Sequence, residues 1–153
     1  MYKILMVCHG NICRSPMAEF VLRDMLKKQH IDGIEVASAA TSTEELGNGI
    51  HRGTARKLHE LGIDCSFKRA RQMNRADYQE YDLLLGADSR NIINMTRIAG
   101  GDAENKILRL LDYTPRPRDI ADPWYTGDFE ATYADVKEGC EHLIAHLKRE
   151  GII

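Results

Sequence analysis

Short apolar runs alternate with longer amphipathic stretches along this chain of 153 residues. The first run, residues 3–7, ends abruptly at Cys8, as a buried parallel strand does where it enters a loop. Ser15 and Pro16 then supply an N-cap and a proline at the first helical position, and apolar residues recur at spacings of three and four from 18 to 26. The pattern therefore predicts a strand, a loop and a helix in succession.

The remainder of the chain continues this alternation. The elements expected are a strand at 34–37, a Ser-, Thr- and Gly-rich loop at 38–49, a helix from about 51 to 62, a strand at 82–87, a helix capped by Asp88 or Ser89, a weaker fourth strand at 107–111, a proline-containing loop at 112–128 and an amphipathic helix from 129 that ends at Gly151. Such alternation favours an α/β fold. We expect residues 1–153 to form a single three-layer domain, in which a small parallel sheet of about four strands is flanked by helices. A ligand site then lies at the carboxyl ends of the strands, and Cys8 stands at such an end.

Composition and charge narrow the range of partners. Apolar residues make up 43% and charged residues 29% of the chain, the balance of a soluble globular protein, and no apolar run reaches the roughly 18 residues that span a membrane. A net charge of −2 gives no field that attracts nucleic acid or an anionic membrane, so neither is an expected partner. The apolar N-terminal run lacks the length and cleavage site of a signal peptide. We therefore expect a cytoplasmic protein whose four cysteines are free thiols.

The stretch from Cys8 to Ser15, CHGNICRS, carries the strongest chemical signal. It places a thiol and the guanidinium of Arg14 six positions apart and ends at a helix N-terminus, so the loop can curl into a ring whose backbone N–H groups bind an anion. Gly10 and Asn11 are best able to adopt the left-handed backbone angles of such a curl. Arg14 can bind two phosphate oxygens at once, and the same positive field favours the thiolate form of Cys8. A phosphate site and a nucleophile then share one centre.

Other interpretations of this loop are weaker. A cysteine at a strand end is often simply a small buried side chain. Cys8 and Cys13 are spaced like a pair of metal ligands, but no second Cys or His cluster with zinc spacing accompanies them, so we predict neither a metal nor a cofactor. A nucleotide-binding loop would end in Gly-Lys-Ser/Thr, which this loop does not. The combination of Cys8 with Arg14 and Ser15 favours phosphate chemistry.

Two motifs carry a resemblance to a known family. Residues 8–19, CHGNICRSPMAE, closely resemble the signature of the low-molecular-weight protein tyrosine phosphatases, and Asp122-Pro123-Trp124 is similar to that family's later Asp-Pro-aromatic motif. The resemblance covers essentially the whole chain. It implies hydrolysis of phosphotyrosine in proteins, or of small aryl phosphates, through a phosphocysteine intermediate on Cys8. Inorganic phosphate and vanadate are then the expected inhibitors.

The resemblance also implies a role for each site residue. Cys8 is the nucleophile and Arg14 binds the phosphate. Asp122 is the general acid for the leaving oxygen and then the general base for the attacking water. Ser38 supports the loop by hydrogen bonding with Asn11. The residues expected to bind substrate are His9, Gly10, Asn11, Ile12, Cys13, Ser15, Trp124 and Tyr125.

Alternative roles remain open for some of these residues. An Asp before proline often only caps a turn, so a catalytic role for Asp122 depends on its partnership with Cys8. Trp124 and Tyr125 either form an aromatic wall for a substrate ring or pack in the core. Asp88 matches a family aspartate near the site, but helix capping explains it equally well.

The chain departs from the family pattern at three places. Glu44, followed by Glu45, stands where many relatives carry an aromatic residue on the rim. His9 stands where many have an apolar residue, and Lys68 replaces a histidine of the supporting network. These departures leave the substrate preference open.

Three other functions share part of this pattern. The members of the protein-arginine phosphatases tend to carry Thr at the position of Ile12. A thioredoxin-coupled arsenate reductase needs two further cysteines in the later half, where only Cys140 lies beyond residue 80. A phosphate-binding module would need neither a nucleophile nor an acid, so the presence of both Cys8 and Asp122 argues against that function. Spacing and resemblance also predict that mild oxidation joins Cys8 and Cys13 in a reversible disulfide.

Overall fold

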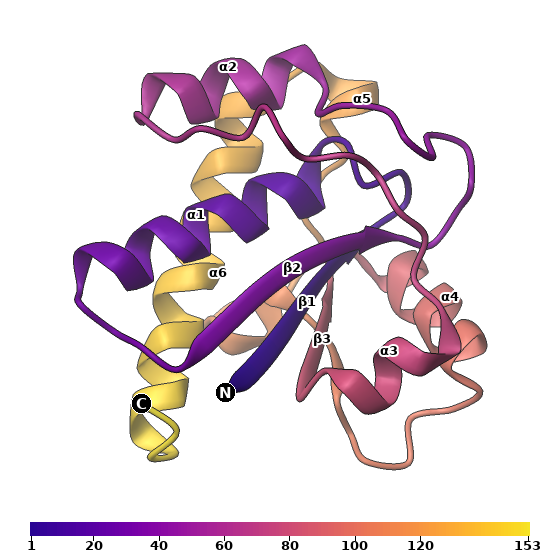
Figure 1. Ribbon diagram of the computed structural model, residues 1–153, viewed down its shortest axis with the longest axis vertical. Helices are drawn as coiled ribbons and strands as arrows, with labels where there is room; N and C mark the ends of the chain where they lie inside the picture. Colours follow the sequence, from indigo (N-terminus) through magenta and orange to yellow (C-terminus); the bar gives the residue numbers. More distant parts are fainter.

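The computed structural model describes all 153 residues, and its four strands form one parallel sheet in the order β2-β1-β3-β4 (Figure 1). The strands are β1 (Tyr2–Cys8), β2 (Ile34–Ala40), β3 (Leu83–Gly86) and β4 (Ile107–Arg109). The helices are α1 (Arg14–Lys28), α2 (Arg52–Glu60), α3 (Arg75–Glu80), α4 (Ser89–Ala99), α5 (Pro123–Thr126) and α6 (Phe129–Arg149), with a 3-10 helix η1 (Leu110–Tyr113). The predicted α/β fold with a four-stranded parallel sheet is confirmed.

The side chains of β1 face two separate parts of the core. Ile4, Met6 and Cys8 belong to a cluster of 23 buried residues that includes the apolar sides of α1 and α6. Leu5 and Val7 belong to a cluster of 10 that includes residues of α3 and α4. This alternation follows from the two-residue period of a strand. Figure 1 accordingly shows α1 and α6 on one side of the sheet and α3 and α4 on the other, which gives the three expected layers.

The parallel register brings the ends of three strands together at one edge. Cys8, the last residue of β1, pairs with Ala40 at the end of β2, and the preceding Val7 pairs with Gly86 at the end of β3. The segments that follow these strands therefore start side by side, as expected for the ligand site of an open α/β sheet. No helix of the chain combines the length and the apolar character needed to cross a membrane.

Two boundaries correct the sequence prediction. Ser15 does not cap the first helix: α1 begins before it, and its N-cap is Cys13, which makes no side-chain capping bond. The hydroxyl of Ser15 is engaged with Cys8 instead. The predicted fourth strand ends at Arg109, because the carboxylate of Asp112 accepts the backbone N–H of Arg109 at 2.8 Å and turns the chain into η1.

Other differences concern short elements. β2 extends to residue 40, so Ser38 lies in a strand and not in the predicted loop. The six-residue helix α3 was not predicted; Asn74 and Asp77 form a capping box that stabilises it despite its polar sequence. The four-residue α5 interrupts the loop predicted at 112–128.

Candidate active site

The loop after β1 runs directly into α1. Within it Asn11 has a φ of 58°, a left-handed conformation that short polar side chains tolerate. Gly10 does not share this conformation, contrary to the sequence expectation. Its missing Cβ instead permits a close approach, because a Cβ there would lie 3.3 Å from Cγ of Glu45. The loop is therefore packed against the segment around Glu45.

The buried sulfur of Cys8 faces Ser15. Cys8 Sγ lies 3.0 Å from Ser15 Oγ and accepts the backbone N–H of Ser15 at 3.4 Å. Nδ2 of Asn11 donates to the same Ser15 oxygen at 2.8 Å, which leaves the hydroxyl proton of Ser15 free to point at the sulfur. This arrangement stabilises a thiolate.

A chain of buried polar groups supports Asn11 from behind. Nδ2 of Asn11 also donates to Oγ of Ser38 at 2.9 Å, and the Ser38 hydroxyl donates to the buried carboxylate of Glu19. Glu19 pairs with Arg23 at 2.7 Å and with Lys68 at 3.5 Å, and Lys68 also donates to the carbonyl of Ser38 at 2.9 Å. A fully satisfied network of this kind holds the loop in one conformation. Sequence reasoning missed Glu19, because a glutamate on an amphipathic helix is usually exposed.

Arg14 is almost completely buried, with 3% of its side chain exposed. Its Nη1 donates to Asp88 at 2.7 Å and to the carbonyl of Ile120 at 2.8 Å, while Nη2 lies 3.5 Å from Oδ2 of Asp122. Burial alone would lower the pKa of Arg14, but the neighbouring Cys8 and Asp88 outweigh it and raise the pKa. The guanidinium is thus a fixed positive charge beside the sulfur.

Asp88 and Asp122 are helix caps as well as neighbours of Arg14. Asp88, not Ser89, caps α4 by accepting the N–H of Asn91 at 2.8 Å. Asp122 caps α5 by accepting the N–H of Trp124 at 3.1 Å. Each of the two aspartates therefore caps a helix and also contacts Arg14.

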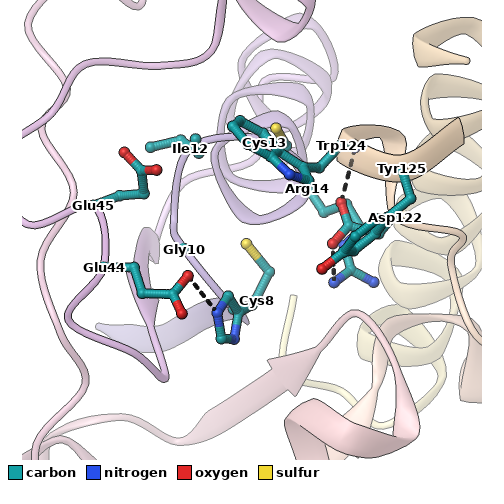
Figure 2. Close-up of a pocket in the computed structure, with 11 residues that line it drawn as sticks. Cys8, Gly10, Ile12, Cys13, Arg14, Glu44, Glu45, Asp122, Trp124 and Tyr125 are labelled. Atoms are coloured by element: carbon teal, nitrogen blue, oxygen red, sulfur yellow. Dashed lines mark hydrogen bonds and ion pairs between the residues drawn. The ribbon is translucent and has the colours of Figure 1, made fainter. Parts of the chain in front are cut away.

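The loop and the segment around Asp122 enclose a pocket of about 110 Å³ (Figure 2). Figure 2 shows Cys8 between two walls, with Glu44 and Glu45 on one side and Asp122 on the other. The lining residues are Cys8, His9, Gly10, Ile12, Cys13, Arg14, Glu44, Glu45, Asp122, Trp124 and Tyr125. Most of the residues expected in the site thus converge on one cavity.

Three residues expected in the site do not line this pocket. Asn11 belongs to the loop, Ser15 to the first turn of α1 and Ser38 to β2; all three side chains are buried and support the loop through the hydrogen bonds described above. Their side chains support the nucleophile rather than the walls of the cavity.

The aromatic wall is exposed. Trp124 and Tyr125 are 57% and 84% exposed, so the alternative of core packing is wrong. The ring of Trp124 meets His51 edge-on at 5.7 Å, and His51 stacks on Phe129 at 5.1 Å between ring centres. His51 thus backs the wall, a role for which its place at the start of α2 gave no sequence signal.

The opposite wall is polar. Nε2 of His9 lies 2.9 Å from a carboxylate oxygen of Glu44. The hydroxyl of Ser42 donates to the carbonyl of His9 at 2.9 Å and fixes this segment to the loop. The rim is therefore acidic, as the sequence indicated for Glu44 and Glu45.

All four cysteines are free. Burial, followed by the nearby Cys8 and Asp122, raises the pKa of Cys13 to about 12, so Cys13 is a neutral thiol at physiological pH. Burial also raises the pKa values of Cys65 and Cys140. No group of three or more His, Cys, Asp or Glu side chains could hold a metal ion.

Comparisons with known proteins agree with this geometry. Residues 3–152 match the family described as low molecular weight phosphotyrosine protein phosphatase. The chain is 39% identical to the low molecular weight protein-tyrosine-phosphatase YfkJ of Bacillus subtilis over 98% of both chains. The crystal structure of YfkJ superposes with a TM-score of 0.94 and covers 98% of this chain and 96% of that chain. SP-PTP, a low molecular weight protein tyrosine phosphatase from Streptococcus pyogenes, is 37% identical with a TM-score of 0.84, over 96% and 93% of the two chains. The Drosophila arginine phosphatase DARP is 27% identical with a TM-score of 0.88, over 95% and 98%. The chain therefore belongs to the low molecular weight protein-tyrosine-phosphatase family of cysteine-dependent hydrolases.

Proposed function

We propose that this enzyme removes phosphate from phosphotyrosine in proteins, and from small aryl phosphates, through a phosphocysteine intermediate on Cys8. One observation carries the proposal: Cys8 lines the same small pocket as Arg14 and Asp122, and its sulfur lies 3.0 Å from the hydroxyl of Ser15. Nucleophile, phosphate ligand and proton donor converge there.

Each step of the reaction has a residue to perform it. The thiolate of Cys8 attacks phosphorus and the bond to the phenolic oxygen breaks, while Asp122 gives that oxygen its proton. Asp122 then takes a proton from water, the water oxygen attacks phosphorus, and the bond to sulfur breaks to release phosphate. Arg14 and the N–H groups of the loop stabilise the charge on the phosphoryl oxygens, and Ser15 stabilises the departing thiolate.

The walls of the pocket favour an aromatic phosphoester. Ile12 contributes an aliphatic surface beside the reacting centre, and Trp124 and Tyr125 offer exposed rings for the substrate phenyl group. The loop residues His9, Gly10 and Cys13 complete the lining around the phosphate. Asn11 and Ser38 keep that loop in shape.

Phosphoarginine is the second candidate substrate. The acidic rim of Glu44 and Glu45 lies where a guanidinium could bind, and a structural relative carries the name arginine phosphatase. We weigh Ile12 more heavily, because it belongs to the loop that follows Cys8 and is buried there, whereas the side chain of Glu44 is exposed on the rim.

The test compares kcat/KM for matched phosphotyrosine and phosphoarginine peptides of the same flanking sequence. We expect the phosphotyrosine peptide to be preferred, and Ile12→Thr to narrow the preference. Cys8→Ser provides the control, because it should fold and bind vanadate yet turn over neither peptide. A clear preference for phosphoarginine would overturn the substrate and leave the Cys8 mechanism standing; turnover by Cys8→Ser would remove the mechanism.

We further propose the cytoplasm as the setting, where reducing conditions keep Cys8 a free thiol. Phosphate and vanadate are the proposed inhibitors, since both match the phosphoryl group that the loop holds. Neither nucleic acid nor a membrane is a proposed partner.

A further inference from the structure

Asp119 makes a compact set of contacts outside the pocket. One of its oxygens, Oδ1, accepts the backbone N–H of Ser89 at 2.9 Å, the hydroxyl of Ser89 at 2.9 Å and Nη1 of Arg109 at 3.1 Å. Ser89 is the first residue of α4, whose N–H has no partner within the helix. A carboxylate from a distant segment thus satisfies the positive end of α4.

The carboxylate of Asp119 is charged when it makes these contacts. Its partial burial alone would raise the pKa, but hydrogen bonds from Arg109 and Ser89 outweigh burial and hold the pKa below its ordinary value. Arg109 is itself held by Asp112, whose Oδ1 accepts Nε of Arg109 at 3.0 Å. The cation that faces Asp119 is therefore fixed in place.

The residue after Asp119 is anchored as well. The N–H of Ile120 donates to the carbonyl of Ala87 at 2.9 Å, its own carbonyl accepts Nη1 of Arg14, and its side chain is buried. Residues 87–89 thus bind Asp119 and Ile120, while Asp88 among them also binds Arg14. One short stretch at the start of α4 holds both the phosphate-binding cation and the segment that leads to Asp122.

Asp122 itself has few contacts that fix its position. Apart from capping the four-residue α5, it makes only the long contact of 3.5 Å with Arg14, and residues 115–122 before α5 form no helix or strand. The short α5 is held by the buried Pro123 and by Trp124 against His51, so the anchored residues just before Asp122 are the second support for the position of its carboxylate.

We propose that Asp119 is a positioning residue for the general acid: its contacts with Ser89 and Arg109 hold Asp122 where it can protonate the leaving oxygen. This rests on the proposed function of Asp122. Proton transfer is steeply sensitive to distance, and a displacement of about 1 Å costs up to about a hundredfold in rate. Asp119 then matters for poor leaving groups, which need the proton, and not for the binding of phosphate.

The experiment compares kcat/KM for phenyl phosphate, a poor leaving group, and 2,4-dinitrophenyl phosphate, whose phenolate departs unaided. Asp119→Ala should lose about tenfold on phenyl phosphate and less than about twofold on the dinitrophenyl ester, with an unchanged inhibition constant for inorganic phosphate. Asp122→Ala should show the same pattern with a larger loss. The double variant should be no slower than Asp122→Ala alone, because a positioning residue has nothing left to position.

Two further variants test whether the lost activity of Asp119→Ala reflects a general loss of structure. Asp119→Asn keeps an acceptor for Ser89 and should retain more of the phenyl phosphate activity than Asp119→Ala. Asp102→Ala is a matched control, since Asp102 also accepts three hydrogen bonds, from Tyr78, Lys106 and Ile107, beyond the opposite end of β4. It should leave the ratio of the two substrates unchanged.

The results distinguish the positioning role of Asp119 from the general-acid role of Asp122. If Asp122→Ala shows the leaving-group pattern but Asp119→Ala loses equally on both esters, loses nothing, or adds its loss fully to that of Asp122→Ala, the positioning role is overturned. If Asp122→Ala itself does not discriminate between the esters, the assignment of the general acid fails and the inference fails with it.

Discussion

Ser15 presents two donors to the sulfur of Cys8, a hydroxyl at 3.0 Å and a backbone N–H at 3.4 Å. The backbone donor is fixed by the start of α1, whereas the hydroxyl is fixed by Asn11, which donates to its oxygen at 2.8 Å. Only the second contact can be removed by substitution. A substitution of Ser15 therefore measures how much the hydroxyl contributes to stabilising the thiolate, while the backbone N–H stays in place.

Ser15→Ala should slow the release of the thiolate from the phosphocysteine. A hydrogen bond to a charged group is worth about 1.5–3 kcal/mol, so we expect kcat to fall by about 10- to 100-fold. The phosphoenzyme should accumulate in rapid-quench experiments. Ser66→Ala, which removes an exposed hydroxyl that donates to Asp64 outside the pocket, should stay near wild type. An unchanged kcat in Ser15→Ala would argue against this role.

Cys13 should react slowly at neutral pH. Its pKa of about 12 keeps it protonated, so iodoacetamide at pH 7 should label Cys8 and spare Cys13. After peroxide treatment, a disulfide between the two should form faster as the pH rises from 7 to 9, because Cys13 attacks as its thiolate. Peptide mapping by mass spectrometry follows both reactions. Sulfonic acid at Cys8 with Cys13 untouched would contradict the disulfide.

Lys68→Met should destabilise the fold, because it removes one of the two cations at the buried Glu19 and the donor to the carbonyl of Ser38. Glu19 keeps Arg23, so we expect a loss of about 1–3 kcal/mol in the free energy of unfolding, measured with urea. Lys28→Met, at an exposed pair with Asp24, should change it by less than about 0.5 kcal/mol. Equal effects of the two variants would count against the network.

The same lysine carries a pH dependence. Burial lowers the pKa of Lys68 below 10.5 despite the opposing effect of Glu19, so the unfolded chain binds its proton more tightly than the folded one. Wild type should therefore gain stability relative to Lys68→Met as the pH rises toward 10.5. Urea titrations at a series of alkaline pH values measure this difference, and a constant difference would refute the assignment.

Gly139→Ala sets two effects against each other. Alanine favours a helix by about 1 kcal/mol over glycine, but a Cβ at this position would lie 2.6 Å from Cγ of the buried Leu110. Overpacking of this kind costs about 1–3 kcal/mol, so the variant should be less stable than wild type in thermal melts. Leu110→Ala in the same chain should relieve the clash and make the two changes strongly non-additive.

A strong chelator should leave the activity unchanged, since the proposed steps need only the side chains of the pocket. The measurement is the rate on an aryl phosphate before and after dialysis against the chelator. Loss of activity that added zinc or magnesium restores would contradict the mechanism.

Part of the molecule could be predicted from sequence because strands and long helices carry periodic patterns. The β1–loop–α1 unit and the helix of residues 129–149 followed directly from them. Leu110 and Leu111 look like strand residues, yet the side chain of Asp112 turns the chain before them. The helix α3 contributes one large side chain, Tyr78, to the core, too few to form an apolar stripe, and its capping box was not recognised.

The candidate site, too, could be predicted from the sequence only in part. The residues of the loop were predictable because their chemistry is local, from a thiol through a ring of N–H groups to a guanidinium. Glu19 and Asp119 were not, because each acts through a partner far away in sequence, Ser38 for one and Ser89 for the other. No local pattern distinguishes such a carboxylate from a solvated one.

The place of β1 in the sheet has a consequence for protein synthesis. Within this domain β1 is synthesised before the other three strands, yet it is an interior strand, and one side of it is covered in part by α6, which is synthesised after the other helices of the domain. The segment that holds Asp122 also emerges late. A growing chain thus carries Cys8 before the residues that surround it in the pocket have been made, so we expect it to be unreactive toward phosphorylated neighbours until the segment of Asp122 and α6 have followed.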